Sequence, residues 1–167
     1  MMGPLHEMFL DELREMYDAE EQLTKALPKM VKTATHPELR DAFESHLEET
    51  KGHYERLERA LEMLGEKAKG DTCEAMKGLV KEGGAIIDEK GDMPDAVVDA
   101  GLIAAGQKVE HYEIASYGTL ITWARMMGHD EVAQLLEQTL SEEKAADEKL
   151  NALAEHGINQ QAMASAA

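Results

Sequence analysis

The stretch of sequence that decides the fold is residues 94–127, PDAVVDAGLIAAGQKVEHYEIASYGTLITWARMM. Apolar or small residues recur in it every three or four positions, at Val98, Leu102, Ala105, Val109, Tyr112, Ser116, Leu120 and Trp123. This spacing follows the 3.6-residue turn of an α-helix and predicts one long helix with a continuous apolar face. Because such a face must be buried, we expect helices of similar length beside it.

Three further segments have the same helical periodicity, at about residues 5–34, 37–64 and 130–156. Pro28 interrupts the first segment and predicts a kink, because proline lacks the N–H that would bond to the preceding turn. The second segment begins at Pro37, which suits a first turn, and stops before Gly65, which suits a C-terminal cap. Asp130 is predicted to be the N-cap of the last segment.

The connections between these segments predict the topology. Two of them are short, so each pair of segments is expected to form an antiparallel hairpin. The middle connection spans about 28 residues, long enough to cross a bundle whose helices measure about 45 Å, and residues 72–88 within it can form one or two short helices. The predicted fold is therefore all-α, a four-helix bundle with the ferritin-like crossover. Residues 1–157 are expected to form one domain, with residues 158–167 as a frayed tail.

Composition excludes several classes of protein. The 167 residues carry 17 basic and 34 acidic side chains, a net charge of −17, which argues against binding nucleic acid or anionic membranes. No apolar run approaches the roughly 20 residues of a membrane span. Cys73 is the one cysteine, expected to be a small buried residue, so an intramolecular disulfide is excluded. With no cationic start before an apolar run, a cytoplasmic protein is expected.

Carboxylates interrupt the apolar faces near the middle of all four predicted long helices. They are Glu20, Glu49, Glu110, Glu113 and Glu143, with Asp147 one turn after Glu143. Buried carboxylates that lie together repel one another and need compensation by protons or cations. Two divalent ions would balance most of five negative charges, and oxygen-rich sites with few imidazoles suit iron or manganese. The alternative is that each glutamate lies on a solvated flank of its helix.

Histidine and tyrosine residues near these glutamates are further candidates. His53 is the best imidazole ligand, because it lies four residues after Glu49 on the same helical face. His46 faces the same stripe and is also compatible with a place at the edge of the core. Tyr17 and Tyr117 lie close enough to hydrogen-bond the glutamates, although ordinary packing with a bonded hydroxyl is the alternative.

Four motifs resemble the YciE/YciF-type stress-protein family, which belongs to the ferritin-like superfamily with rubrerythrins and manganese catalases. They are Asp18-Ala19-Glu20, His46-Leu47-Glu48-Glu49-Thr50, Lys108 to Leu120 (KVEHYEIASYGTL) and Glu142-Glu143-Lys144-Ala145. The resemblance covers nearly the whole chain, and the third motif is very specific. It implies a small helical bundle, a homodimer and a link to stress responses.

The wider superfamily implies a ligand set that this chain matches in part. A glutamate from each of two helices and Glu-x-x-His from each of the other two form that site. Glu20, Glu49, Glu110 and Glu143 match the four glutamates, and Glu113 resembles an additional glutamate of rubrerythrins. The histidines differ, because Gly52 and Ala146 follow three residues after Glu49 and Glu143. Spacings of four residues supply His53 and Asp147 instead.

Two functions of different classes follow from these patterns. The first is a dimetal oxidoreductase in which Glu49 and Glu143 bridge two Fe or Mn ions that act on peroxide or dioxygen, or oxidise ferrous iron. In this hypothesis Glu113 or His53 transfers a proton. The second is a structural or interaction protein without catalytic activity, which the departure from Glu-x-x-His favours. Whether the protein is an enzyme is left undecided by the sequence.

Overall fold

The computed structural model describes residues 3–165 and confirms the predicted all-α class. Four long helices and two shorter ones follow in chain order: α1 (Pro4–Thr33), α2 (Pro37–Met63), α3 (Glu74–Asp88), α4 (Asp95–Met126), α5 (Asp130–Leu153) and α6 (Asn159–Ala164). A five-residue π-helical turn, Ala154–Ile158, joins α5 to α6. Within the described part of the chain, no segment forms a β-strand.

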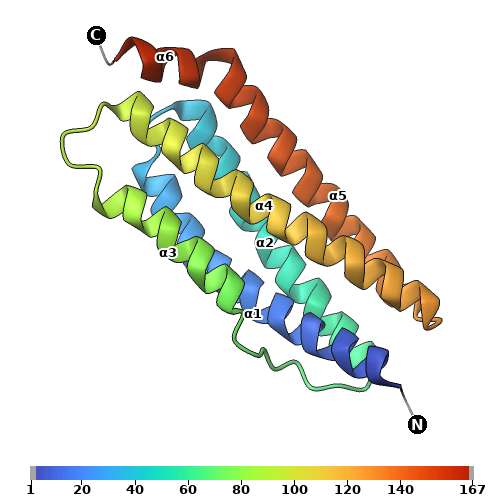
Figure 1. The fold of residues 1–167 in the computed structure, drawn as a ribbon. Coiled ribbons are helices and arrows are strands. Elements are labelled where there is room, and N and C mark those ends of the chain that lie inside the picture. Colours follow the sequence, from blue (N-terminus) through green and yellow to red (C-terminus); the bar gives the residue numbers. More distant parts are fainter. Residues whose placement is uncertain (1–2, 166–167) are drawn as a thin grey trace.

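The long helices pack side by side around a common interior. Helix α1 packs against α2, and α4 packs against α5, while contacts of α2 with α5 and of α1 with α4 close the bundle (Figure 1). The connection from α2 to α4 passes along the bundle through α3, so α2 and α4 run in the same direction (Figure 1). Helix α3 lies against α1 and α4. The middles of the four long helices therefore face one another.

Helix boundaries follow the residues that were expected to set them. Pro4 and Pro37 occupy the first turns of α1 and α2, where the missing N–H would have no partner within the helix. Gly65 and Gly128 follow the ends of α2 and α4 with φ angles of +77° and +79°. Residues with a Cβ rarely adopt this left-handed conformation, so glycine suits both positions.

Pro28 lies inside α1, which continues as one helix to Thr33. Two local expectations need correction. Asp130 is the first residue of α5, and His129 takes the N-cap position. The tail from residue 158 does not fray over its described part, because Ile158 is buried against the core and residues 159–164 form α6, which packs on α4. Residues 166 and 167 lie outside the described range.

A buried carboxylate fixes the turn between α1 and α2. Asp99 of α4 accepts hydrogen bonds from the backbone N–H groups of Thr35 and His36, each at 2.8 Å, and from the Thr35 hydroxyl at 2.7 Å. Cys73 is fully buried, as predicted, and its Sγ accepts a hydrogen bond from the Met76 N–H at the start of α3. Across residues 3–165, no helix combines the length and apolar content needed to cross a membrane.

Candidate metal centre

Six ionisable side chains from all four long helices meet inside the bundle. They are Glu20 of α1, His46 and His53 of α2, Glu110 and Glu113 of α4, and Glu143 of α5. None is more than 6% exposed, and Glu20, His53, Glu113 and Glu143 are fully buried. Glu110 and Glu113 are three residues apart, and His46 and His53 are seven apart. Both spacings keep the two residues on one face of their helix. The bundle thus encloses four carboxylates and two imidazoles.

These side chains form two overlapping groups with the spacing of metal ligands. One group contains His46, Glu110, Glu113 and Glu143, and the other contains Glu20, His53 and Glu143. Within each group, one potential ligand atom of every residue lies within 4.8 Å of those of the others. Glu143 belongs to both groups. It is therefore placed to bridge two sites.

Each histidine lies against carboxylates of more than one helix. His46 Nε2 is 3.0 Å from Glu110 Oε1 and 3.6 Å from Glu143 Oε2. His53 Nδ1 is 2.8 Å from Glu143 Oε1 and 3.6 Å from Glu20 Oε1. The angles at His46 Nε2 and His53 Nδ1 are not those of hydrogen bonds, since neither nitrogen has such a partner in the described structure. Both nitrogens thus point into the cluster without being satisfied by it.

Unsatisfied polar atoms are concentrated at this cluster. Ten buried side-chain nitrogen or oxygen atoms among the described residues have no hydrogen-bond partner, and eight of them belong to these six residues. They include both carboxylate oxygens of Glu113 and of Glu143. A buried polar atom without a partner costs free energy, so such a concentration requires compensation. Carboxylate oxygens and imidazole nitrogens are the donors that iron and manganese accept, so the residues fit a pair of such ions.

The burial of like charges is visible in the pKa values. Burial raises the pKa of Glu113 well above its usual value, and the neighbouring carboxylates of Glu143, Glu20 and Glu110 raise it further. Burial and Glu110 raise the pKa of Glu143 to about 7. Burial by itself lowers the pKa of His53, but Glu143 and Glu20 outweigh this effect and raise it to about 10. Without metal, the cluster therefore retains protons that bound cations would displace.

A second ring of residues orients the ligands. The Tyr117 hydroxyl donates a hydrogen bond to Glu20 at 2.5 Å. Glu142 lies 2.9 Å from His53 Nε2 and forms two bonds of 2.8 Å with the Arg56 guanidinium. Burial alone would raise the pKa of Glu142, but Arg56 and His53 together lower it. An ionised Glu142 holds the proton of His53 on Nε2 and leaves Nδ1 for the cluster.

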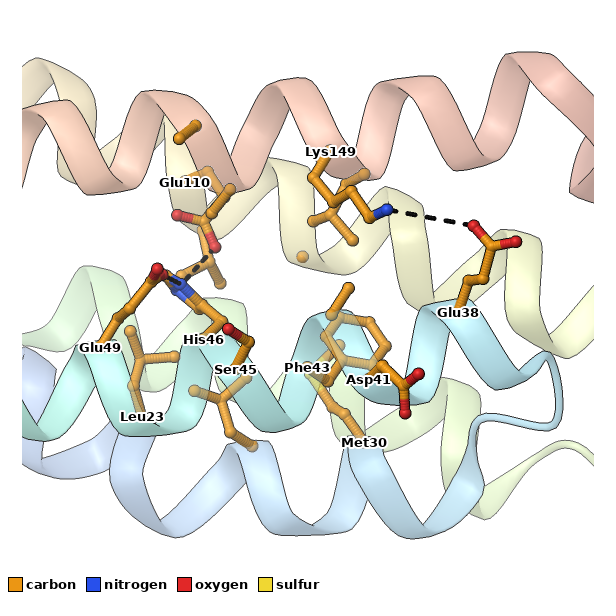
Figure 2. Close-up of a pocket in the computed structure, with 17 residues that line it drawn as sticks. Leu23, Met30, Glu38, Asp41, Phe43, Ser45, His46, Glu49, Glu110 and Lys149 are labelled. Atoms are coloured by element: carbon orange, nitrogen blue, oxygen red, sulfur yellow. Dashed lines mark hydrogen bonds and ion pairs between the residues drawn. The ribbon is translucent and has the colours of Figure 1, made fainter.

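Of the seven predicted metal ligands, the structure brings five together: Glu20, His53, Glu110, Glu113 and Glu143. Glu49 lies beside the cluster with a side chain that is 39% exposed, and its Oε2 is 3.2 Å from His46 Nδ1 (Figure 2). Asp147 bonds to His111 and Gln107 instead. Neither Glu49 nor Asp147 belongs to a ligand group.

His46, which the sequence left open between a ligand and a residue at the edge of the core, belongs to a ligand group, whereas Glu49 does not. The spacing of seven residues between His46 and His53 was the available signal, since residues i and i+7 share a helical face. Tyr117 bonds the cluster, whereas Tyr17 stacks on Tyr54 with ring centroids 4.3 Å apart. Thus one of the two tyrosine candidates contacts the site.

Fold and site together define a class: an all-α bundle that encloses a carboxylate–histidine cluster competent to hold metal. The chain matches the family described as "Domain of unknown function (DUF892)" over residues 4–163, and it belongs to that family. It is similar to the protein YciF of Escherichia coli strain K12, with 46% identity over 164 residues that cover 96% of each chain. The resemblance of the sequence motifs to the YciE/YciF-type family is thereby confirmed.

Solved structures share both sequence and fold with this chain. The E. coli stress protein YciF is 45% identical, with a TM-score of 0.88 over 95% of this chain and 99% of that chain. YcfI of Rhodopseudomonas palustris, a proposed structural protein, is 46% identical, with a TM-score of 0.84 over 89% of this chain and 94% of that one. A Xanthomonas campestris protein is 26% identical, with a TM-score of 0.75 over 95% and 96% of the two chains.

Proposed function

We propose that this protein is a ferritin-like bundle that holds two divalent Fe or Mn ions and acts on peroxide or dioxygen, or oxidises ferrous iron as substrate. The observation that carries this proposal is the placement of Glu143, which is fully buried, belongs to both ligand groups and has two oxygens without hydrogen bonds. Such a carboxylate suits a bridge between two cations. A role in the stress response is proposed from the similarity to YciF.

The ligand groups assign residues to the two ions. His46, Glu110 and Glu113 would hold one ion, Glu20 and His53 would hold the other, and Glu143 would contact both. A bound pair of Fe or Mn ions supplies one-electron redox chemistry, which these side chains do not have themselves. Burial raises the pKa of Glu113 in the metal-free cluster, so its carboxyl group would release a proton when an ion binds. The hydrogen bond from Tyr117 keeps Glu20 turned toward the cluster.

A structural role without catalysis is the second candidate function. The similarity to YcfI, a proposed structural protein, favours it. So does the chain's departure from Glu-x-x-His, because Gly52 and Ala146 stand where that pattern has histidine. In this alternative, the buried carboxylates are neutralised by the protons that Glu113 and the histidines retain. A homodimer and a cytoplasmic location are proposed for either function.

Metal analysis separates the two candidates. Protein from cells grown with added iron and manganese is expected to contain about two ions per chain by elemental analysis, and added Mn²⁺ should raise its unfolding temperature. Glu143→Gln should abolish both effects, because it removes the bridging charge. Glu148→Gln is the matched control, since Glu148 is an exposed glutamate of the same helix. Absence of metal in the wild type, with no thermal shift, would favour the structural role.

A further inference from the structure

A cavity of about 350 Å³ lies beside the candidate metal centre. It is enclosed by α1, α2, α4 and α5, and one of its ends is formed by His46 and Glu110 of the cluster (Figure 2). At the opposite end, Lys149 Nζ lies 4.0 Å from Glu38 Oε2, and both side chains are largely exposed (Figure 2). The cavity thus extends from the cluster toward the surface.

The cavity is much larger than the oxidants considered above. Peroxide and dioxygen are two-atom molecules of roughly the size of one or two waters, about 30 Å³ each. A volume of 350 Å³ falls in the range of pockets that hold organic ligands. Small residues on three helices, among them Ala42, Gly106 and Ala146, leave this space open. The size indicates an organic molecule.

The walls and the inner end differ in polarity. Leu23, Leu27, Phe43, Val109 and Leu150 form apolar walls between the two ends. At the inner end, the lining residues His46, Glu49 and Glu110 are polar, while His46 Nε2 and Glu110 Oε2 themselves are turned into the cluster. An occupant that matches these surfaces has an apolar body between the aliphatic walls and a polar group at the inner end.

Charge at the rim selects against anions. Glu38 and Asp41 line the outer part of the cavity, and Lys149 is the one lysine or arginine among its lining residues. A carboxylate-bearing amphiphile would therefore be repelled at the rim and would meet Glu110 at the inner end. Metal ions bound by Glu110 and His46 would supply positive charge at the inner end, so a cationic ligand would gain nothing there. Because anions are disfavoured at the rim and cations at the inner end, the cavity favours a ligand whose polar end is neutral.

We infer that this cavity binds a neutral organic hydroperoxide, with the apolar body between the aliphatic walls and the hydroperoxyl end at His46 and Glu110. The inference rests on the proposed function, which it narrows from peroxides in general to those with an apolar body. Reduction of a hydroperoxide breaks the O–O bond, consumes two electrons and two protons, and yields one alcohol and one water. The two divalent ions that the cluster would hold would supply these electrons, one from each ion.

The alcohol product retains the apolar body and one polar end, so it is an unreactive probe of the cavity. Titration of 2-phenyl-2-propanol, the alcohol of cumene hydroperoxide, into the full-length protein by calorimetry should show saturable binding at one site. Ala146→Phe should weaken binding at least about tenfold, because the new ring fills the cavity. Ala152→Phe, on the same helix but outside the cavity lining, is the matched control. Ala42→Leu is a second filling variant if Ala146→Phe fails to fold.

The outcomes separate this inference from the proposed function, because Mn²⁺ binding is measured on the same samples. Mn²⁺ binding without alcohol binding would overturn the inference and leave the metal centre in place. Equal alcohol binding by wild type and both filling variants would place the ligand elsewhere and also overturn it. Tighter binding of hexanoate or benzylamine than of the alcohol would contradict the neutral class. If the alcohol bound but Mn²⁺ did not, the proposed metal centre would be wrong. The hydroperoxide assignment depends on that centre and would be overturned with it.

Discussion

His53 of α2 lies with Nε2 2.9 Å from Glu142 of α5, so that Nδ1 faces the buried cluster. Glu143, the next residue along α5, lies 2.8 Å from that Nδ1. Two consecutive glutamates therefore contact opposite nitrogens of one imidazole. The arrangement assigns them different roles, because Glu142 orients the ring and Glu143 shares the ligand groups.

Glu142→Gln is expected to weaken Mn²⁺ binding without removing it. A glutamine cannot supply the charge that stabilises a protonated Nε2, so His53 would be less firmly held with Nδ1 toward the cluster. Outer-shell substitutions of this kind typically cost about 10- to 100-fold in metal affinity. Calorimetric titration of Mn²⁺ measures the change. Unchanged affinity, in a variant as stable as the wild type, would mean that Glu142 serves only its ion pair with Arg56.

Glu113→Gln is expected to raise the dissociation constant for Mn²⁺ more than Glu49→Gln does. Glu113 is fully buried and belongs to a ligand group, whereas the Glu49 side chain is 39% exposed and contacts His46 Nδ1. The same titrations with both variants provide the comparison. A larger loss in Glu49→Gln would restore Glu49 as the ligand that the sequence predicted.

Metal affinity is expected to fall as the pH is lowered through about 7. Glu143 has a pKa of about 7 in the metal-free cluster, and protonation below that value removes its charge. At pH 8, binding should release protons, because His53, with a pKa of about 10, must lose one to become a ligand. Titrations in buffers of different ionisation enthalpy count the released protons. If Mn²⁺ affinity did not depend on pH and binding released no protons, the proposed protonation of Glu143 and His53 in the metal-free cluster would be wrong.

Asp99→Ala is expected to destabilise the fold by about 2–4 kcal/mol, because it removes a buried carboxylate that accepts three hydrogen bonds from the α1–α2 turn. Asp92→Ala is the matched control, since Asp92 is exposed in the connection before α4. Urea unfolding gives the free energy of unfolding of each variant. Equal stability of both variants would show that the turn needs no anchor on α4.

The sequence by itself determined the helices, their boundaries within a few residues and the presence of acidic groups near the core. These features depend on contacts within a few residues of one another, since periodicity, proline and glycine act locally. The tail after Gly157 shows the limit of this reasoning. Its composition predicts fraying, but a surface on the folded bundle buries Ile158 and supports α6.

Only the tertiary structure decided which neighbours on a helix face inward. His46 and Glu49 are three residues apart, and such positions differ by only about 60° around the helix axis. Packing of α2 against α1 and α5 therefore sets the rotation that buries His46 and leaves the Glu49 side chain partly exposed beside it. The same applies to Asp147, which follows Glu143 by one turn yet turns toward His111. Local sequence supplies the ligand types, whereas rotation and spacing of the packed helices select the atoms that meet.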